Sequence, residues 1–118
     1  SLDLDKDIRV EVREDCFGLP CGGKAKYNKN QLLIIVSSQV VENGHQHTQA
    51  VTWHELGHGL LFRDHLQEQN EIGVPKSFMY QRYSWDLIEP AIYDSMVVVW
   101  KEEMFLNLVT IYLLTLNS

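Results

Sequence analysis

The stretch Trp53-His54-Glu55-Leu56-Gly57-His58 places two histidines four positions apart, with a glutamate directly after the first. Apolar residues from about Thr48 onward have helical spacing, which predicts a helix with Thr48 as its N-cap. Because four residues turn a helix by about 400°, His54 and His58 share one face and can reach one metal ion. The Glu55 carboxylate, next to the first ligand, can hydrogen-bond a metal-bound water. These features predict a zinc hydrolase.

A catalytic zinc usually takes a third protein ligand, for which Asp64 and His65 are the candidates. On an uninterrupted helix His65 would face the metal but lie about 10 Å further along the axis than His58, beyond reach of the same ion. Asp64 would also be too far away and would point elsewhere. The helix must therefore end near Leu61 to Arg63, and the chain must fold back. Imidazole suits zinc, so His65 is the preferred ligand, and Asp64 stays open as the alternative or as an outer partner.

The segment from His54 to His65 resembles the active-site segment of metzincin zinc peptidases, whose pattern is HExxHxxGxxH, or ends in Asp in the snapalysin group. Downstream, Pro75-Lys76-Ser77-Phe78-Met79-Tyr80 resembles the Met-turn, whose methionine, here Met79, lies beneath the metal. The nearest likeness is to small bacterial zinc metallopeptidases in which the third histidine comes one residue later, after an arginine; a snapalysin-like chain is second. The resemblance covers roughly Val51 to Tyr80.

This resemblance implies an α+β, metzincin-like domain with a short sheet, an active-site helix, a Met-turn and C-terminal helices. It also implies a zinc-dependent endopeptidase, with Zn²⁺ held by His54, His58 and His65 and a peptide or protein as its partner. Glu55 would take a proton from the zinc-bound water and deliver it to the leaving amine. Substrate would lie extended along an edge strand, for which Leu32 to Ser37 is the candidate.

The chain also departs from the metzincin pattern. Leu61 stands where metzincins have the glycine that lets the chain turn, and Asp64 stands where they have the third histidine. Some metzincins bind the metal through a tyrosine two residues after the methionine, and Gln81 occupies that position here. The nearby phenols of Tyr80 and Tyr83 are instead the candidates for stabilising the oxyanion and forming a wall of the substrate pocket.

Two other functions stay open. In a gluzincin-type peptidase a later glutamate (Glu89, Glu102 or Glu103) would supply the third ligand, although the segment Ser77 to Tyr80 argues against it. Alternatively, the chain is a zinc-bound but inactive domain that serves binding or surface attachment. The short length and the apolar stretch Met96 to Leu116 favour this second alternative.

The rest of the first half predicts strands followed by a turn. Asp7 to Arg13 alternates apolar and charged residues, which is typical of a half-buried strand. Cys16 to Asn30 is rich in glycine and asparagine and is predicted to be a long loop. Leu32 to Ser37 is predicted to be a buried strand, and Asn43-Gly44 a turn.

The segments around and after the zinc motif predict loops and then helices. His45-Gln46-His47 is interpreted as a polar loop, and Gln67 to Lys76 as a second loop. Helices are expected from about Ser84, with an interruption before Pro90. The last of them, Met96 to Leu116, is apolar on nearly every side, so it is either buried or covers a partner surface.

Composition limits the remaining possibilities. The 118 residues predict one domain, 1–118, and the net charge of −6 gives no electrostatic basis for binding nucleic acid. The longest apolar runs, Leu32 to Val36 and Met96 to Trp100, are too short for a membrane span. A chain that opens at Ser1 is expected to be trimmed, and the resemblance implies export. Cys16 and Cys21 are a disulfide or two free thiols, and the oligomeric state stays open.

Overall fold

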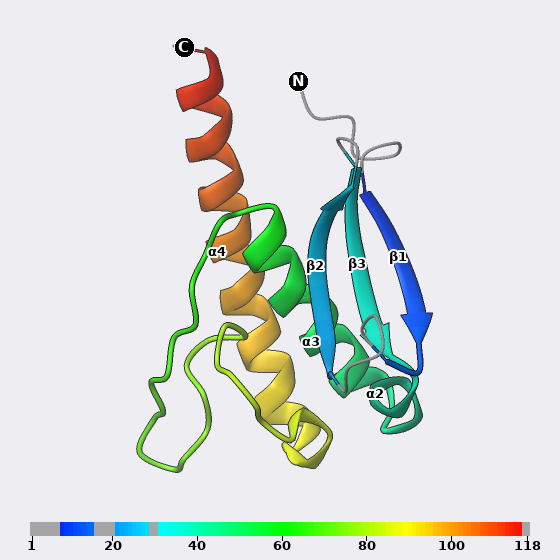
Figure 1. Ribbon diagram of the computed structural model, residues 1–118. Coiled ribbons are helices and arrows are strands. Elements are labelled where there is room, and N and C mark those ends of the chain that lie inside the picture. Colours follow the sequence, from blue (N-terminus) through cyan, green and yellow to red (C-terminus); the bar gives the residue numbers. More distant parts are fainter. Residues whose placement is uncertain (1–7, 16–20, 29–30, 117–118) are drawn as a thin grey trace.

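A computed structural model describes residues 8–15, 21–28 and 31–116 (Figure 1). It confirms the predicted α+β class, with strands first and long helices later. The elements are β1 (Ile8–Arg13), β2 (Gly23–Asn28), β3 (Gln31–Ser37), α2 (Ser38–Glu42), α3 (His45–Gly59), the 3₁₀ helix η1 (Trp85–Leu87) and α4 (Pro90–Leu116).

The three strands form one sheet in the order β1-β3-β2, in which β1 runs parallel and β2 antiparallel to β3. The alternating residues Leu32, Ile34 and Val36 of β3 are fully buried against the helical side. Because β3 has a neighbour on both sides, the prediction that Leu32 to Ser37 is an edge strand is wrong. An added peptide strand cannot pair with β3, whose backbone groups are already used.

The prediction of a loop over Cys16 to Asn30 is also wrong for its second half, since β2 occupies Gly23–Asn28. In this strand Ala25 and Tyr27 alternate with lysines. The Tyr27 hydroxyl donates a hydrogen bond to the Gly59 carbonyl, 2.7 Å away, which ties β2 to the end of α3. The first residues of the predicted loop, 16–20, lie outside the described residues.

Helix α3 begins at His45 with Gly44 as its N-cap at φ 113°, four residues before the predicted N-cap Thr48. His45-Gln46-His47 is therefore its first turn and not a polar loop. Thr48 does not cap the helix; its hydroxyl donates back to the Gly44 carbonyl at 2.9 Å. The predicted turn at Asn43-Gly44 is present, and it joins α3 to the short helix α2, which the sequence pattern does not indicate.

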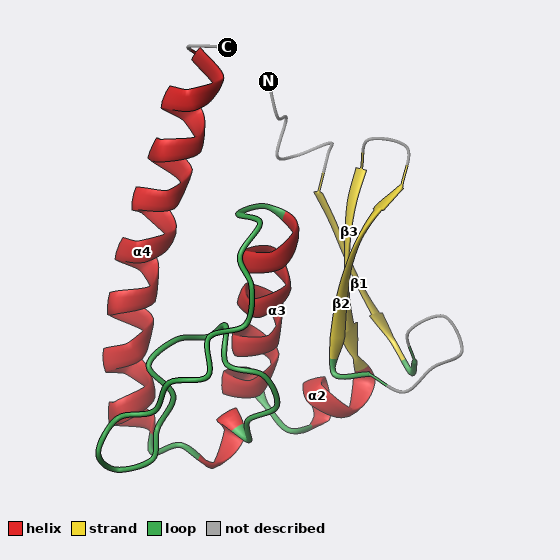
Figure 2. Cartoon of the chain, turned by 60° about the vertical axis from the view of Figure 1, so that its left-hand side comes forward, coloured by secondary structure: helices red, strands yellow, loops and turns green. Residues whose placement is uncertain are grey.

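Helix α3 lies between the sheet and α4, as Figures 1 and 2 both show. Towards the sheet it packs so closely at Gly59 that an added Cβ would come within 2.6 Å of Leu32. On its other side, the loop after α3 carries Phe78 into an aromatic cluster with Trp85 and Trp100. Over the described residues, no helix is both long enough and apolar enough to cross a membrane.

Candidate metal centre

The two histidines of α3 face the same space, as their spacing predicts. His54 and His58 lie one turn apart, and their Nε2 atoms are 3.1 Å from each other. Both side chains are half-buried. The helix therefore presents two imidazole nitrogens at one point, which is the arrangement required for a shared metal ion.

His65 lies close to these two histidines because α3 ends before it and the chain turns back. Helix α3 ends at Gly59, and Phe62 adopts a left-handed conformation with φ 53°. The Arg63 amide then donates to the Gly57 carbonyl at 2.9 Å, which reverses the chain direction. The turn brings the His65 Nε2 atom to 3.1 Å from that of His58. Phe62 thus makes the reversal for which metzincins use a glycine one position earlier.

The hydrogen bonds of the Nδ1 atoms of His54 and His58 indicate which ring nitrogens carry protons. The Nδ1 atom of His54 lies 2.5 Å from the Phe78 carbonyl oxygen, and that of His58 lies 2.7 Å from the Arg63 carbonyl oxygen. A carbonyl can only accept, so both Nδ1 atoms are donors, and in the neutral form of each ring the Nε2 atom holds a lone pair. Lone pairs 3.1 Å apart repel each other unless a cation lies between them. The donor set therefore fits a metal ion, with the carbonyls as its outer partners.

His54 is also kept in the form that binds metals. Burial lowers its pKa to about 4, an effect that the hydrogen bond to the Phe78 carbonyl opposes and the neighbouring His58 and His65 reinforce. The ring is therefore neutral at physiological pH. Metal ligands must be deprotonated, so this environment favours metal binding.

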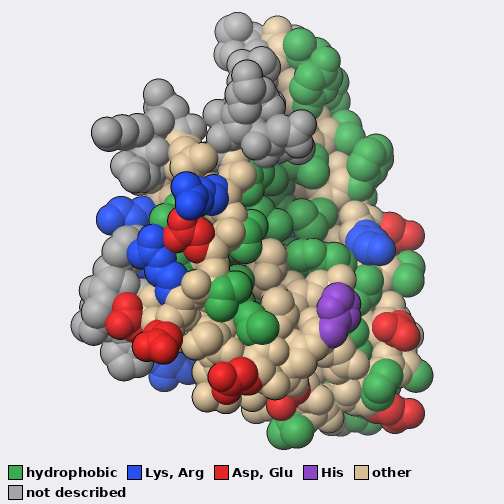
Figure 3. All heavy atoms as spheres, turned by 90° about the vertical axis from the view of Figure 1, so that its right-hand side faces the viewer, with side chains coloured by type: hydrophobic (Ala, Val, Ile, Leu, Met, Phe, Trp, Pro, Cys, Tyr) green, Lys and Arg blue, Asp and Glu red, His purple; other side chains and the backbone are tan. Residues whose placement is uncertain are grey.

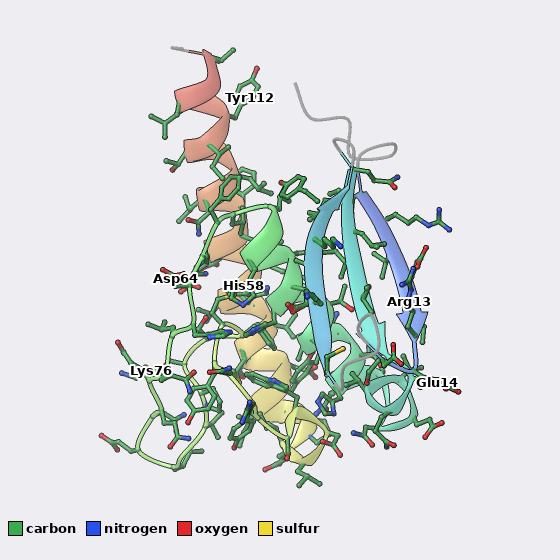
Figure 4. All side chains as sticks on the ribbon, in the orientation of Figure 1. Arg13, Glu14, His58, Asp64, Lys76 and Tyr112 are labelled. Carbon is green, nitrogen blue, oxygen red and sulfur yellow. The ribbon has the colours of Figure 1, made fainter. Side chains whose placement is uncertain are left out.

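The other ligand candidates lie away from this cluster. Figure 4 shows Asp64 turned outward, away from His58. Glu103 forms an ion pair with Arg63 at 3.3 Å, and Glu89 and Glu102 are exposed. In the part of the chain that the structure describes, His54, His58 and His65 are the one group of ligand-type side chains that could hold a metal.

Glu55 is buried beside the histidines, with 6% of its surface exposed. No hydrogen bond or ion pair from the described residues reaches its carboxylate. Burial raises its pKa to about 7, because a charged carboxylate loses hydration there. Glu55 is therefore a carboxyl group able to exchange a proton near neutral pH.

The predicted turn at Ser77 to Tyr80 lies directly beneath α3. The Tyr80 amide donates to the Ser77 carbonyl at 3.2 Å, and the Ser77 hydroxyl accepts from the Met79 amide at 3.0 Å. Met79 is fully buried, and its sulfur packs so tightly on Gly57 that an added Cβ would overlap it. Since Gly57 lies between the two histidines of the helix, Met79 supports the floor of the candidate centre.

A cavity of about 520 Å³ opens in front of the histidines and Glu55. Its opposite walls come from the start of β2 and from the segment after Met79. The sequence does not predict the first wall, because Cys16 to Asn30 is interpreted as a loop. The alternation Lys24-Ala25-Lys26-Tyr27 could have indicated the strand. The lining residues are Cys21, Gly22, Gly23, Lys24, Ala25, His47, Val51, His54, Glu55, His58, His65, Tyr80, Gln81, Arg82, Tyr83 and Trp85.

Both predicted phenols line this cavity, but they differ in their hydrogen bonds. The Tyr83 hydroxyl donates to the Gly73 carbonyl at 3.3 Å, so its proton is already used. The Tyr80 hydroxyl accepts from the Gln69 side chain at 2.9 Å and keeps its own proton for another acceptor. Of the two, Tyr80 is therefore better suited to stabilise an oxyanion.

His47, which the sequence pattern places in a loop, lines the cavity from the first turn of α3. Its Nδ1 atom lies 3.1 Å from the Asn43 side-chain nitrogen and 3.5 Å from an Asp86 carboxylate oxygen. Burial lowers the pKa of His47, and the charge of Asp86 partly opposes this. His47 therefore has partners of its own and stands apart from the three-histidine cluster.

Cys21, which lines the cavity, is disulfide-bonded. The sequence contains one other cysteine, Cys16, which lies outside the described residues. Of the two alternatives for these cysteines, the structure therefore supports the disulfide.

Comparisons of the chain with protein-family models, with curated proteins and with solved structures give no match.

Proposed function

We propose that the chain is a zinc-dependent peptidase with a metzincin-like site, in which His54, His58 and His65 hold the metal. The observation that carries this proposal is the convergence of three Nε2 atoms, two of them on rings whose Nδ1 atoms donate to carbonyls. Structural zinc sites are usually closed by four protein ligands, whereas catalytic sites use three and leave one position open. Three histidines beside a cavity therefore favour a catalytic site.

Zinc bound there would activate a water molecule and polarise the scissile carbonyl. Glu55 acts as the general base, which takes up a proton at its carboxylate and returns it to the leaving amine. Its raised pKa of about 7 supports this role, because a base works best when its pKa is close to the working pH. Tyr80, whose hydroxyl proton is available, donates to the oxyanion.

The substrate is proposed to be an extended peptide that pairs with β2. This strand uses one edge to pair with β3, and its first residues, Gly23 to Ala25, line the cavity. No other described strand pairs with its second edge. Main-chain pairing there would hold a peptide across the histidines, with Tyr80 and Tyr83 on the opposite wall. Export of the protein is also proposed, and the disulfide at Cys21 supports it.

The experiment compares the parent chain with Glu55→Gln for zinc content and for cleavage of a mixed peptide library. Glu55→Gln should retain one zinc per chain and lose at least about 100-fold in rate, which is typical for loss of a general base. Glu68→Gln, an exposed glutamate, is the matched control and should cleave at the parent rate. Parent-like cleavage by Glu55→Gln would contradict the mechanism. A parent chain that binds zinc and cleaves nothing would favour the inactive binding domain.

A further inference from the structure

Helix α4 has two apolar faces, and the described residues of the domain pack against one of them. The inner face carries Tyr93 and Trp100, each with 2% of its surface exposed, in the aromatic cluster beneath α3. Arg63 places its guanidinium 5.1 Å from the centre of the Trp100 ring, which adds a contact to the loop after α3. This face anchors the helix to the domain.

The outer face carries a second apolar stripe over the last three turns of the helix. We define the C-terminal stripe as Phe105, Leu106, Val109, Tyr112, Leu113 and Leu116. These side chains are 37% to 66% exposed. Steps of four, three and four residues from Phe105 to Leu116 form the spacing of a coiled-coil seam, with Leu106 and Leu113 beside it.

The outer face of α4 is more polar in its first half than in its second. In the first half the exposed outer positions include the polar residues Asp94, Ser95, Lys101 and Glu102 beside Val98 and Val99. After Met104 the outer positions of the stripe are apolar. A helix that is apolar all round is normally buried on every side, and a continuous exposed apolar patch marks an interaction site.

No described element covers the C-terminal stripe. In Figures 1 and 2 the last turns of α4 extend beyond the end of α3. Figure 3, seen from the sheet side, shows hydrophobic side chains at its upper right, at the height where α4 ends in Figure 1; the outer face of α4 lies on the far side of this view.

We infer that the stripe docks a second copy of this chain, α4 against α4 in antiparallel orientation. At about 150 Å² for a large exposed side chain, the six residues offer on the order of 500 Å². Val98 and Val99 lie one heptad before Phe105 and Leu106 and are also exposed. With them, the apolar area that each chain can bury exceeds roughly 600 Å², the lower end of the range for stable complexes. A self-complementary stripe needs no further surface to form a closed dimer.

Glu102 favours the antiparallel orientation. It lies in the same seam, three residues before Phe105. In a parallel pair its carboxylate would face Glu102 of the second copy, and like charges across a seam repel each other. An antiparallel pair centred near Asn107 places Glu102 opposite Tyr112 of the second copy, whose phenol can donate a hydrogen bond to it. The acidic residues Asp94, Glu102 and Glu103 also disfavour an anionic membrane surface as the occupant.

The dimer is tested by light scattering and sedimentation of the purified chain, which should give about twice the mass of the 13.7 kDa monomer. Leu113→Glu should weaken the dimer at least 100-fold, since each copy then buries a carboxylate at the edge of the apolar interface. Leu114→Glu is the matched control: Leu114 is 67% exposed but lies off the stripe, so this variant should remain dimeric. Both variants should keep the far-UV circular dichroism spectrum and the thermal unfolding midpoint of the parent chain, which shows that the domain still folds.

A monomer at every concentration would overturn the inference, and so would equal loss of the dimer in both variants. Binding of the parent chain to phosphatidylcholine vesicles without self-association would instead assign the stripe to a lipid surface. Orientation is read from spin labels on Ser95→Cys, which should lie about 36 Å apart in the antiparallel dimer. Labels about 10 Å apart would indicate a parallel pair and contradict the proposed orientation. None of these results depends on the peptidase proposal.

Discussion

The Nε2 atoms of His58 and His65 lie 3.1 Å apart, although the helix that carries His58 ends one residue later. The short connection achieves this because Phe62 takes a left-handed conformation and Arg63 bonds back to Gly57. The third nitrogen therefore reaches the helix face without the glycine found in the metzincin pattern. The candidate centre depends on this reversal as much as on the histidines themselves.

Replacing His65 should remove most of the metal affinity. His65→Ala deletes one of three nitrogen ligands, so the zinc dissociation constant should rise at least about 100-fold in a competition titration with a chelator. Asp64→Ala serves as the control, because the Asp64 carboxylate is exposed and turned away from His58. The zinc affinity of this variant should match that of the parent chain. The opposite result, with Asp64→Ala losing zinc and His65→Ala retaining it, would make Asp64 the ligand.

Gly57→Ala should destabilise the protein through Met79. The new Cβ would overlap the methionine sulfur, and overpacking a core typically costs about 1–3 kcal/mol of unfolding free energy. Gly22→Ala, where a Cβ meets nothing within 4 Å, should leave chemical denaturation almost unchanged. Shortening Met79 to alanine should make the Gly57 substitution less costly than it is in the parent chain. Additive effects of the two changes would show that this contact does not govern stability.

Glu55 should make the metal-free protein less stable as the pH rises. Its pKa is about 7 in the folded chain against an ordinary value of 4.5, so its contribution is fully present below pH 4.5 and is lost as the pH rises through 7. The unfolding free energy falls by up to about 3 kcal/mol as Glu55 ionises, and Glu55→Gln avoids this loss because glutamine does not ionise. Thermal unfolding in a chelator should therefore show Glu55→Gln gaining stability over the parent between pH 4.5 and about 8. A constant difference across this range would mean that burial does not shift the pKa of the carboxyl.

Arg63 should hold the loop that carries His65 through its side chain. Its guanidinium contacts both the Trp100 ring and the Glu103 carboxylate, while its backbone carbonyl orients His58. Arg63→Ala keeps the carbonyl but frees the loop, and we expect zinc affinity to fall about tenfold, as for loss of an outer-sphere support. Lys101→Ala, an exposed cation on α4, is the control. Unchanged zinc affinity in Arg63→Ala would show that the loop keeps its conformation without the contacts of the Arg63 guanidinium to Trp100 and Glu103.

The sequence predicts the local features of the candidate site well and the pairing of distant segments poorly. The shared face of His54 and His58 follows from helix geometry. The helix end is predicted because His65 must reach the same ion, and the turn at Met79 is predicted from the resemblance to the Met-turn. The central position of β3 does not, because the order of strands depends on tertiary pairing. The sequence pattern does not predict β2, because the glycines and lysines of this segment favour a loop more strongly than the alternation of its residues favours a strand. The pattern also does not predict the start of α3, because a glycine replaces the usual polar N-cap.

Anomalous X-ray scattering at the zinc edge, on a crystal of the zinc-loaded protein, tests the central claim most directly. We expect one ion within bonding distance of the Nε2 atoms of His54, His58 and His65, with Glu55 outside the coordination shell. Zinc bound by Asp64 or by a glutamate of α4, or no ion at the three histidines after zinc loading, would contradict it.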